Sequence, residues 1–419
     1  MDLISDIVKD NEEFSLWRRD IHAHPELAFE EKRTSEFVAE KLESYGIEVT
    51  RGVGKTGVVG TLKVGSSGKS IGLRADMDAL PMEELNTFSH KSRHPGCMHG
   101  CGHDGHTVML LAAARYLAKS QNFDGVVQFI FQPAEESNAI GSGAKAMIDD
   151  GLFERFNIDN VFAFHNGPEL AAGVIATRPG ILNASIDLFE VAIRAKGCHG
   201  AFPQDGNDPL MIAAQMLTAW QTIVSRNINA QDSVVVSAAS INAGNSWTVI
   251  PERAVIKGSI RALSPHVRAL VKNRFYELTN NIALAFGADV KINYRAKSPS
   301  CINDDKQTTF ACDVAESVFG KDRVLRTMPA DMGSEDFGYL LQKRPGCYLV
   351  IGAAPIHSGE DPLKGQSIKE LGMEPWLFRD ACMLHQPNYD FNDGIIPYGA
   401  TLFARLAESY LCIRKESSL

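Results

Sequence analysis

The sequence lacks the features of several protein classes. It has no run of about 18 or more apolar residues, so we expect no membrane-spanning helix. It has no basic excess, because 51 acidic residues against 42 basic ones give a formal charge of −9, and nucleic-acid binding needs a basic surface. The N-terminal stretch MDLISDIVKDNEEF has no basic segment followed by an apolar one, so we expect no secretory signal. These absences favour a cytoplasmic protein that acts on a small molecule.

Several common motifs are also incomplete. The eight cysteines are scattered along the chain, so we expect reduced thiols rather than a disulfide framework. GVGKT at 52–56 has Val49 where a phosphate-binding loop needs glycine, and GSGAKA at 141–146 lacks the third glycine of a dinucleotide motif. No G-x-S-x-G sequence occurs, so a serine hydrolase has no nucleophile motif here.

The distribution of helix and strand patterns predicts two domains. A chain of 419 residues is too long for one ordinary core. Its first 170 residues alternate strand-like and helical stretches, which is typical of an α/β sheet covered by helices. From about residue 184 the order becomes β-α-β-β-α-β, the ferredoxin-like pattern. We therefore predict an α/β catalytic domain of residues 1–183 and 297–419, with an inserted α+β domain of residues 184–296.

The sequence MHGCGHDGHT at 98–107 is the first candidate metal site. Cys101 and His103 offer a thiolate and an imidazole, which suit borderline-soft cations, although a glycine-rich loop with incidental histidines would look the same. Further metal-compatible groups follow three strand-like runs, and ligands of α/β sheets sit beyond such strand ends. These groups are Asp76, Asp78, Glu135, Glu136 and His165. Their convergence favours a metal site over coincidence.

The two consecutive glutamates predict a division of labour. Adjacent side chains on an extended chain point in opposite directions. One of Glu135 and Glu136 can therefore bind a metal while the other reaches a water molecule on it. A solvated acidic surface is the alternative, but an apolar run and a proline lead directly into this pair.

The chain as a whole resembles the M20 metallopeptidase family, in the amidohydrolase branch that includes hippurate hydrolases and plant auxin-conjugate hydrolases. The resemblance rests on RRDIHAHPELAFEE, LRADMDALPMEE, MHGCGHDGHTVMLLAAA, FQPAEE, HNGP, SEDF and HQPNYDFND. It implies a zinc-peptidase-like catalytic domain with a central mixed sheet. It also implies that the inserted ferredoxin-like domain serves as a lid and in dimerisation, so that a homodimer or larger homo-oligomer is expected.

The resemblance also implies a dimetal hydrolase that cleaves the amide bond of an N-acyl or N-aroyl amino acid. Two divalent ions (Mn, Zn, Ni or Co) would hold the attacking hydroxide. Glu135 would be the general base, Asp78 would orient a ligand, and His199 of the lid would polarise the substrate carbonyl. Cys101 would bridge the two ions. The implied metal ligands are Cys101, His103, Glu136, His165 and His385.

Other residues of the resembling motifs are assigned supporting roles. For His22 and His24 we favour a structural role, because HPE is typical of a turn at a helix end. His99 and His106 flank the ligands, and we expect them to support the loop rather than bind metal. Asn245, in GNSWTVIP, resembles a residue of a substrate-facing loop.

Departures from the family pattern leave the substrate open. Gly167 stands where relatives commonly have a bulkier residue, which predicts a wider or reshaped pocket, and Cys198 and Gly200 flank the lid histidine unusually. An extra segment at 355–384 precedes His385. A deaminase that removes an amino group from an activated aromatic amine, and a non-catalytic binding relative, therefore remain as alternatives.

Overall fold

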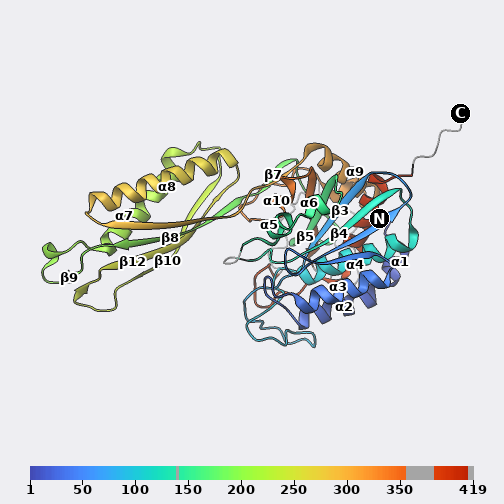
Figure 1. Ribbon diagram of the computed structural model, residues 1–419, viewed down its shortest axis with the longest axis horizontal. Helices are drawn as coiled ribbons and strands as arrows, with labels where there is room; N and C mark the ends of the chain where they lie inside the picture. The colour runs from blue at the N-terminus through green and yellow to red at the C-terminus, as the bar shows by residue number, and fades with distance from the viewer. Residues whose placement is uncertain (138–140, 355–381, 414–419) are drawn as a thin grey trace. The chain divides into compact units, whose positions relative to one another are not determined.

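The protein is described here by a computed structural model, which covers residues 1–137, 141–354 and 382–413. Contacts divide the chain into two compact units (Figure 1). Unit 1 comprises Met1–Gly180, Ile302–Pro329 and Tyr339–Leu419, and unit 2 comprises Ile181–Cys301 and Ala330–Gly338. Among the described residues, none of the helices has both the length and the apolar character needed to cross a bilayer.

Unit 1 is built on a mixed sheet of eight strands, which confirms the predicted α/β class. The central strands β4, β3, β5 and β16 run parallel to one another, whereas β1 and β2 run antiparallel to their neighbours. The strands in spatial order are β1 (Glu48–Val53), β2 (Gly57–Val64), β4 (Gly125–Gln132), β3 (Ser70–Asp76), β5 (Asn160–Ala171), β16 (Gly346–Ala354), β6 (Ile175–Ala176) and β15 (Val324–Leu325).

The core of unit 1 lies between this sheet and its helices. Helix α4 is the most enclosed of them, because every side chain from His103 to Ala114 is buried. It packs beside α11, and both contact β3. The helices are α1 (Ser5–Lys9), α2 (Asn11–Ala23), α3 (Lys32–Ser44), α4 (His103–Ser120), α5 (Gly143–Asp149), α6 (Leu152–Arg155), α9 (Asp305–Phe319), α10 (Gly338–Leu341) and α11 (Ile396–Tyr410).

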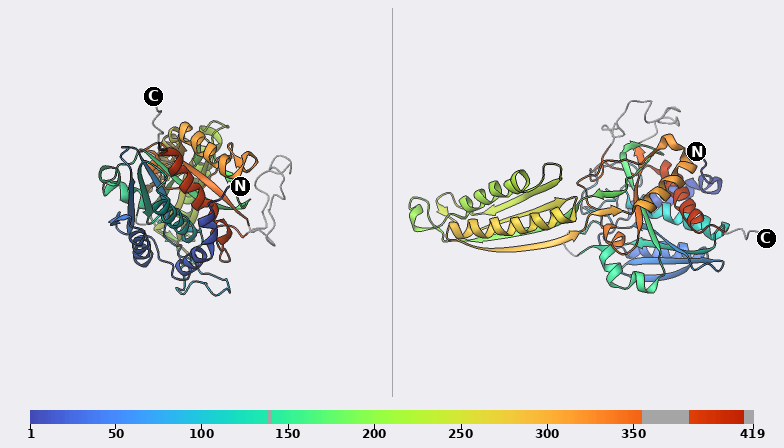
Figure 2. Two further views of the ribbon diagram at one scale, coloured as in Figure 1. Left: turned by 90° about the vertical axis from the view of Figure 1, so that its right-hand side faces the viewer. Right: turned by 90° about the horizontal axis from the view of Figure 1, so that it is seen from above.

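Unit 2 has the ferredoxin-like topology that the sequence predicted. Its strands β8 (Ser185–Arg194), β10 (Val234–Ala243), β12 (Arg253–Ala262) and β13 (Asp289–Ser298) form an antiparallel sheet in the order β10-β12-β8-β13. Helices α7 (Pro209–Thr222) and α8 (Pro265–Ala285) lie side by side along this sheet (Figure 2). Their core contains the aromatic rings of Phe189, Trp220 and Phe275, which contact one another in edge-to-face and tilted arrangements.

Two short strands form a separate two-stranded sheet in unit 2, and two more lie where the chain passes between the units. In unit 2, β9 (Cys198–His199) pairs with β11 (Val249–Ile250). The chain enters unit 2 through β7 (Gly180–Asn183) and leaves it through β14 (Cys301–Asn303).

Candidate metal centre

The candidate site lies where the parallel strands of unit 1 end. Strands β3 and β4 are parallel and in register from Ser70 to Asp76, so the residues that follow them emerge at the same edge of the sheet. Helix α4 begins at this edge with His103, and Cys101 lies just before it. Gly102 makes the turn with a φ of 90°, and a Cβ there would come within 2.4 Å of Asn166 Oδ1, so only glycine fits.

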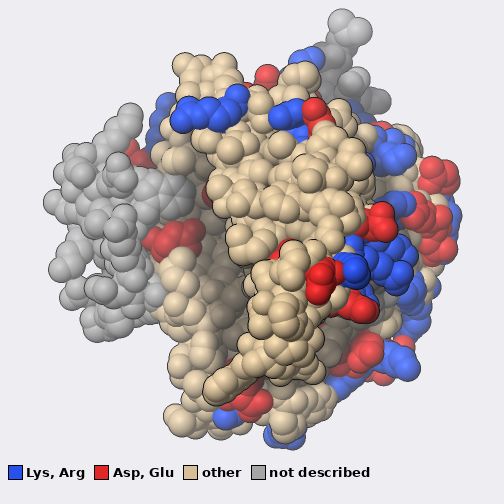
Figure 3. All heavy atoms as spheres, turned by 90° about the vertical axis from the view of Figure 1, so that its left-hand side faces the viewer, with Lys and Arg blue, Asp and Glu red and all other residues tan. Residues whose placement is uncertain are grey.

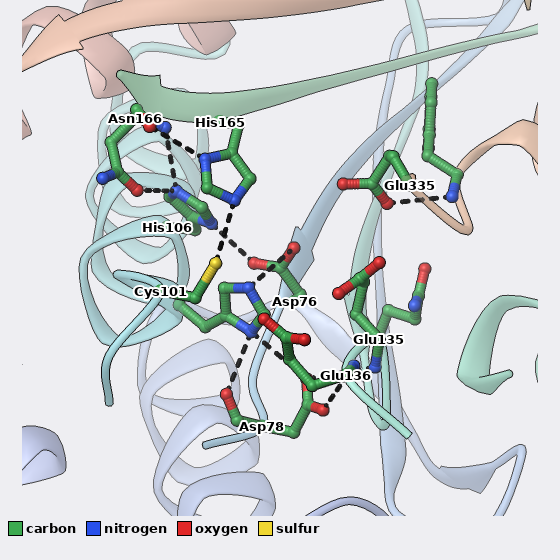
Figure 4. A network of polar contacts seen from close by, with 12 residues as sticks. Asp76, Asp78, Cys101, His106, Glu135, Glu136, His165, Asn166 and Glu335 are labelled. Atoms are coloured by element: carbon green, nitrogen blue, oxygen red, sulfur yellow. Dashed lines mark hydrogen bonds and ion pairs between the residues drawn. The ribbon is translucent and has the colours of Figure 1, made fainter. Parts of the chain in front are cut away.

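The structure brings all five predicted ligands and Glu135 into overlapping groups. Figure 4 shows four of these residues close together, namely Cys101, His165, Glu135 and Glu136. Within each group the candidate ligand atoms lie within 4.8 Å of one another. Cys101 Sγ is 3.3 Å from His165 Nε2 and 3.4 Å from His385 Nε2. Three groups consist of these residues alone: Cys101–His103–His165, Cys101–Glu136–His385 and His103–Glu135–Glu136. Two further groups, Asp76–His103–His106 and Glu135–Glu335–Asp336, adjoin them. Cys101 therefore stands between two sets of nitrogen and oxygen donors.

Hydrogen bonds orient two of the imidazoles toward the cluster. His103 Nδ1 donates to the carbonyl oxygen of Asp78 at 2.9 Å and to Asp78 Oδ1 at 3.2 Å. His165 Nδ1 donates to the carbonyl oxygen of Asn166 at 2.8 Å. With the proton on Nδ1, the Nε2 lone pair of each ring faces the other donors, as in most metal-binding histidines. Among the described residues, the buried Nε2 of His103 has no hydrogen-bond partner, although Asp76 Oδ2 lies 3.7 Å away, and buried polar atoms normally have such a partner.

Burial and charge set the protonation of the donors. Burial lowers the pKa of His165 to about 3, which keeps this imidazole neutral and able to coordinate. Burial, together with the charge of Glu136, raises the pKa of the Cys101 thiol well above its ordinary value. Burial also opposes ionisation of Glu136, but the hydrogen bond from His385 and nearby positive charges lower its pKa. A divalent cation would reverse the balance at Cys101, because it favours the thiolate.

Asp78 connects one imidazole to the two glutamates. Besides His103, its carboxylate accepts the backbone N–H of Glu135 at 3.1 Å and that of Glu136 at 2.9 Å. Asp78 itself is 1% exposed. One buried carboxylate thus fixes a candidate ligand and the backbone that carries the glutamate pair.

A second layer of polar residues lies behind the cluster. His106 Nδ1 is 2.6 Å from Asp76 Oδ1, and its Nε2 faces Asn166. Asn166 donates to the hydroxyl of Tyr389 at 2.6 Å, and Arg74 donates to Asp76 at 2.8 Å. Sequence analysis gave no role to Asn166 or Tyr389. Both residues do stand in motifs that carry the family resemblance, Asn166 in HNGP and Tyr389 in HQPNYDFND.

A buried network of charged side chains also contacts Asp104 in the first turn of α4. His22 lies 2.9 Å from Asp104 through Nδ1 and 3.2 Å from Glu84 through Nε2, and all three side chains are at most 2% exposed. Arg18 reaches Asp104 at 3.5 Å. Burial alone would lower the pKa of His22, but the hydrogen bonds to Asp104 and Glu84 raise it to about 9.

This raised pKa predicts a pH-dependent loss of stability in the chelator-treated protein. A histidine with a folded pKa of about 9 and an ordinary value of 6.5 stabilises the fold fully below pH 6.5, and the gain disappears as the pH rises to 9. We expect the free energy of unfolding to fall by on the order of 3 kcal/mol over this interval. In denaturant titrations, the free energy of unfolding of His22→Gln should change little with pH over this interval, while that of the control His24→Gln should fall as in the wild type. Equal slopes in both variants would contradict the prediction.

Two predicted substrate residues lie in unit 2. His199 is exposed and pairs with Val249 between β9 and β11. Its Nδ1 accepts the N–H of Ala201 at 3.0 Å, which places the ring proton on Nε2. Asn245 is exposed in the connection between β10 and β11. Figure 3 looks onto the end of unit 2, and charged side chains are sparse over the centre of that view.

The remaining substrate prediction concerns Gly167. This residue is buried within β5, and a Cβ there would come within 2.7 Å of Val350 Cγ1 on the neighbouring strand. Its small size therefore serves close packing between β5 and β16. Of the predicted extra segment 355–384, residues 355–381 lie outside the described residues.

Comparisons with known proteins agree in pointing to one family. The model of peptidase family M20/M25/M40 matches residues 72–363. Hippurate hydrolase of Campylobacter jejuni is 41% identical over 98% of this chain and 100% of its own length. N-acetyl-L-cysteine deacetylase of Bacillus subtilis is 39% identical over 82% of this chain and 81% of its own length. The crystal structure of Bacillus subtilis YXEP, described as a dinuclear metal-binding peptidase of the M20 family, is 29% identical with a TM-score of 0.77, over 96% of this chain and 99% of that one.

Proposed function

Because this chain belongs to peptidase family M20/M25/M40 and is a metal-dependent amidohydrolase, we propose that it hydrolyses the amide bond of N-acyl or N-aroyl amino acids with two divalent metal ions. The observation that carries the proposal is the shared position of Cys101, which belongs both to the group with His103 and His165 and to the group with Glu136 and His385. A single thiolate between two donor sets suits a bridging ligand.

The residues present fit such a pair of cations. The neutral imidazole of His165 is a ready donor. The buried Nε2 of His103 makes no hydrogen bond within the described residues, and a cation there would displace the proton that Asp76, 3.7 Å away, favours on this ring. Nitrogen, sulfur and carboxylate donors together suit Zn, Mn, Co or Ni. Divalent cations, when bound, make water more acidic and polarise a carbonyl oxygen.

Glu135 is the residue that we assign to proton transfer. It is 8% exposed, and the hydrogen bond from its backbone to Asp78 fixes its position beside Glu136. Its carboxylate takes a proton from the water that adds to the amide carbon, and returns that proton to the nitrogen when the C–N bond breaks. Glu136, which is held 2.9 Å from His385, serves as a ligand instead.

His199 of unit 2 is assigned to the substrate carbonyl. Because Nδ1 accepts a backbone N–H, the exposed Nε2–H is available to donate to the oxygen that becomes negative during attack. We propose that Asn245 contacts the substrate, as the sequence suggested. Gly167 allows β5 to pack against β16, and we propose that its lack of a side chain also shapes the substrate region. All eight cysteines are free, which suits the reducing cytoplasm. We also propose that the protein forms a homodimer or a larger homo-oligomer.

The proposal is tested by product analysis. Purified protein loaded with Mn, Zn, Co or Ni is incubated with N-benzoyl, N-acetyl and indole-acyl amino acids, and with simple aryl amines. We expect equal amounts of carboxylic acid and free amino acid, and no products after treatment with a chelator. Release of ammonia from the aryl amines without any acid would instead establish the deaminase. Metal-loaded protein that binds but converts none of the compounds would contradict both reactions.

A further inference from the structure

The backbone immediately before Glu135 has an unusual conformation. Ala134 has a φ of 53°, in the left-handed region that residues other than glycine rarely adopt, and it is fully buried. Such a conformation persists only where its surroundings impose it. What holds Ala134 therefore also helps to decide where the side chain of Glu135 begins.

Hydrogen bonds to Glu31 are the first of two interactions that hold the backbone of Ala134 in this conformation. Its Oε1 accepts the backbone N–H of Ala134 at 2.9 Å and that of Phe29 at 3.0 Å, and the hydroxyl of Thr56 donates to its Oε2. The side chain of Glu31 is completely buried. Asp78 accepts the next two amides, so two buried carboxylates hold three successive N–H groups, from Ala134 to Glu136.

Close packing against Gly143 is the second interaction that holds this backbone. The carbonyl oxygen of Ala134 accepts the N–H of Gly143 at 3.0 Å. A Cβ at Gly143 would lie 1.6 Å from the carbonyl oxygen of Pro133, so the two segments are in direct backbone contact. The backbone around Ala134 is thus held from both sides. Glu31 is the side chain that accepts the N–H of Ala134 itself, and it comes from 103 positions earlier in the sequence.

We propose that Glu31 is a positioning residue for Glu135, acting through its hydrogen bond to the strained backbone of Ala134. The proposal rests on the proposed function, in which Glu135 transfers the proton. An error of about 1 Å in the position of a reacting group can cost on the order of 100-fold in rate. Loss of the restraint should therefore lower kcat more than it changes KM.

To hold Ala134, the side chain at position 31 must place a hydrogen-bond acceptor within bonding distance of the Ala134 N–H, but it need not carry a charge. Burial and the nearby charge of Asp78 raise the pKa of Glu31 to about 7, and either form of the carboxyl group can accept the N–H of Ala134. Glu31→Gln keeps an acceptor oxygen at the same reach. Glu31→Asp keeps the charge but is one methylene shorter, so that it no longer reaches Ala134.

The first experiment compares these two variants by steady-state kinetics. We expect Glu31→Asp to lower kcat by about 10- to 100-fold with little change in KM, and Glu31→Gln to stay within about threefold of the wild type. Glu30→Gln, at an exposed neighbouring position, is the matched control. Equal impairment of Glu31→Asp and Glu31→Gln would overturn the proposal, as would full activity of Glu31→Asp.

The second experiment tests whether Glu31 acts through Ala134. Glycine adopts a positive φ without strain, so Ala134→Gly should restore about five- to tenfold of the kcat lost in Glu31→Asp. In the wild-type background, where Glu31 already holds the turn, the same substitution should bring no gain. Failure of Ala134→Gly to improve the Glu31→Asp protein would show that Glu31 does not act through this backbone.

The third measurement uses metal-free protein and needs no substrate. By hydrogen-exchange mass spectrometry, Glu31→Asp should accelerate exchange in the peptide that spans 131–137 by at least about tenfold, with α4 unchanged as the internal reference. Exchange that stays at the wild-type rate, or rises equally throughout the chain, would overturn the proposal. If the wild type hydrolyses none of the acyl amino acids, the proposed function fails, while this measurement still decides whether Glu31 holds the turn.

Discussion

Glu135→Gln should lower kcat by about 10²- to 10⁴-fold while the protein keeps its metal ions, because a general base contributes a factor of this size. The amide has nearly the shape of the carboxylate but cannot accept the proton. The backbone hydrogen bond from Glu135 to Asp78 does not involve the side chain and should survive the substitution. Kinetics and metal analysis of the same preparation check both halves of the result.

The neighbouring glutamate provides the matched control. Glu136 contacts His385 and belongs to the group around Cys101, so Glu136→Gln should lower metal content as well as activity. The two substitutions are chemically identical and adjacent, and they differ only in the proposed role of the side chain. If Glu135→Gln keeps full activity, or if it loses metal as Glu136→Gln does, the assignment of the base is wrong.

The sequence predicted the regular elements best where their patterns were strong. The stretch SIGLRAD at 70–76 has the composition of a strand, and β3 has these same bounds, with every residue from Ser70 to Asp76 buried. The patterns failed where elements are short or interrupted. The N-terminal stretch forms two helices that are divided at Asp10, α1 and α2, and β6 and β15 have two residues each, too few to show any periodicity.

The site could be predicted only as far as its residue types cluster along the chain. Cys101 and His103 stand in one motif, and the glutamate pair follows an apolar strand. His165 was expected at the end of its strand, but β5 continues to Ala171, because β16 pairs along that further stretch.

The supporting residues stand in the quoted motifs, but the sequence does not show which residues they contact. Glu31 lies 103 positions before Ala134, and in sequence it reads as an ordinary acidic residue at the start of α3. Tyr389 lies 223 positions beyond Asn166. Such pairs become visible only when the topology of the sheet brings their segments together, so that the residues that position a site are harder to read than the residues that form it.

Cys101→Ala should remove the donor common to both groups and therefore lower the content of both metal ions, not of one alone. Activity should fall with metal content, and high concentrations of added metal should restore little of it, because the alanine methyl group offers no lone pair. Cys97→Ala is the matched control: Cys97 is also buried, at 8% exposure against 7%, and its thiol contacts only the carbonyl oxygen of Pro25 among the hydrogen bonds of the described residues. Metal analysis after gel filtration should separate the two variants clearly. If Cys101→Ala retained two ions per chain, or lost no more than Cys97→Ala, then the thiol would not lie between the cations and the two donor groups would have to be filled without it.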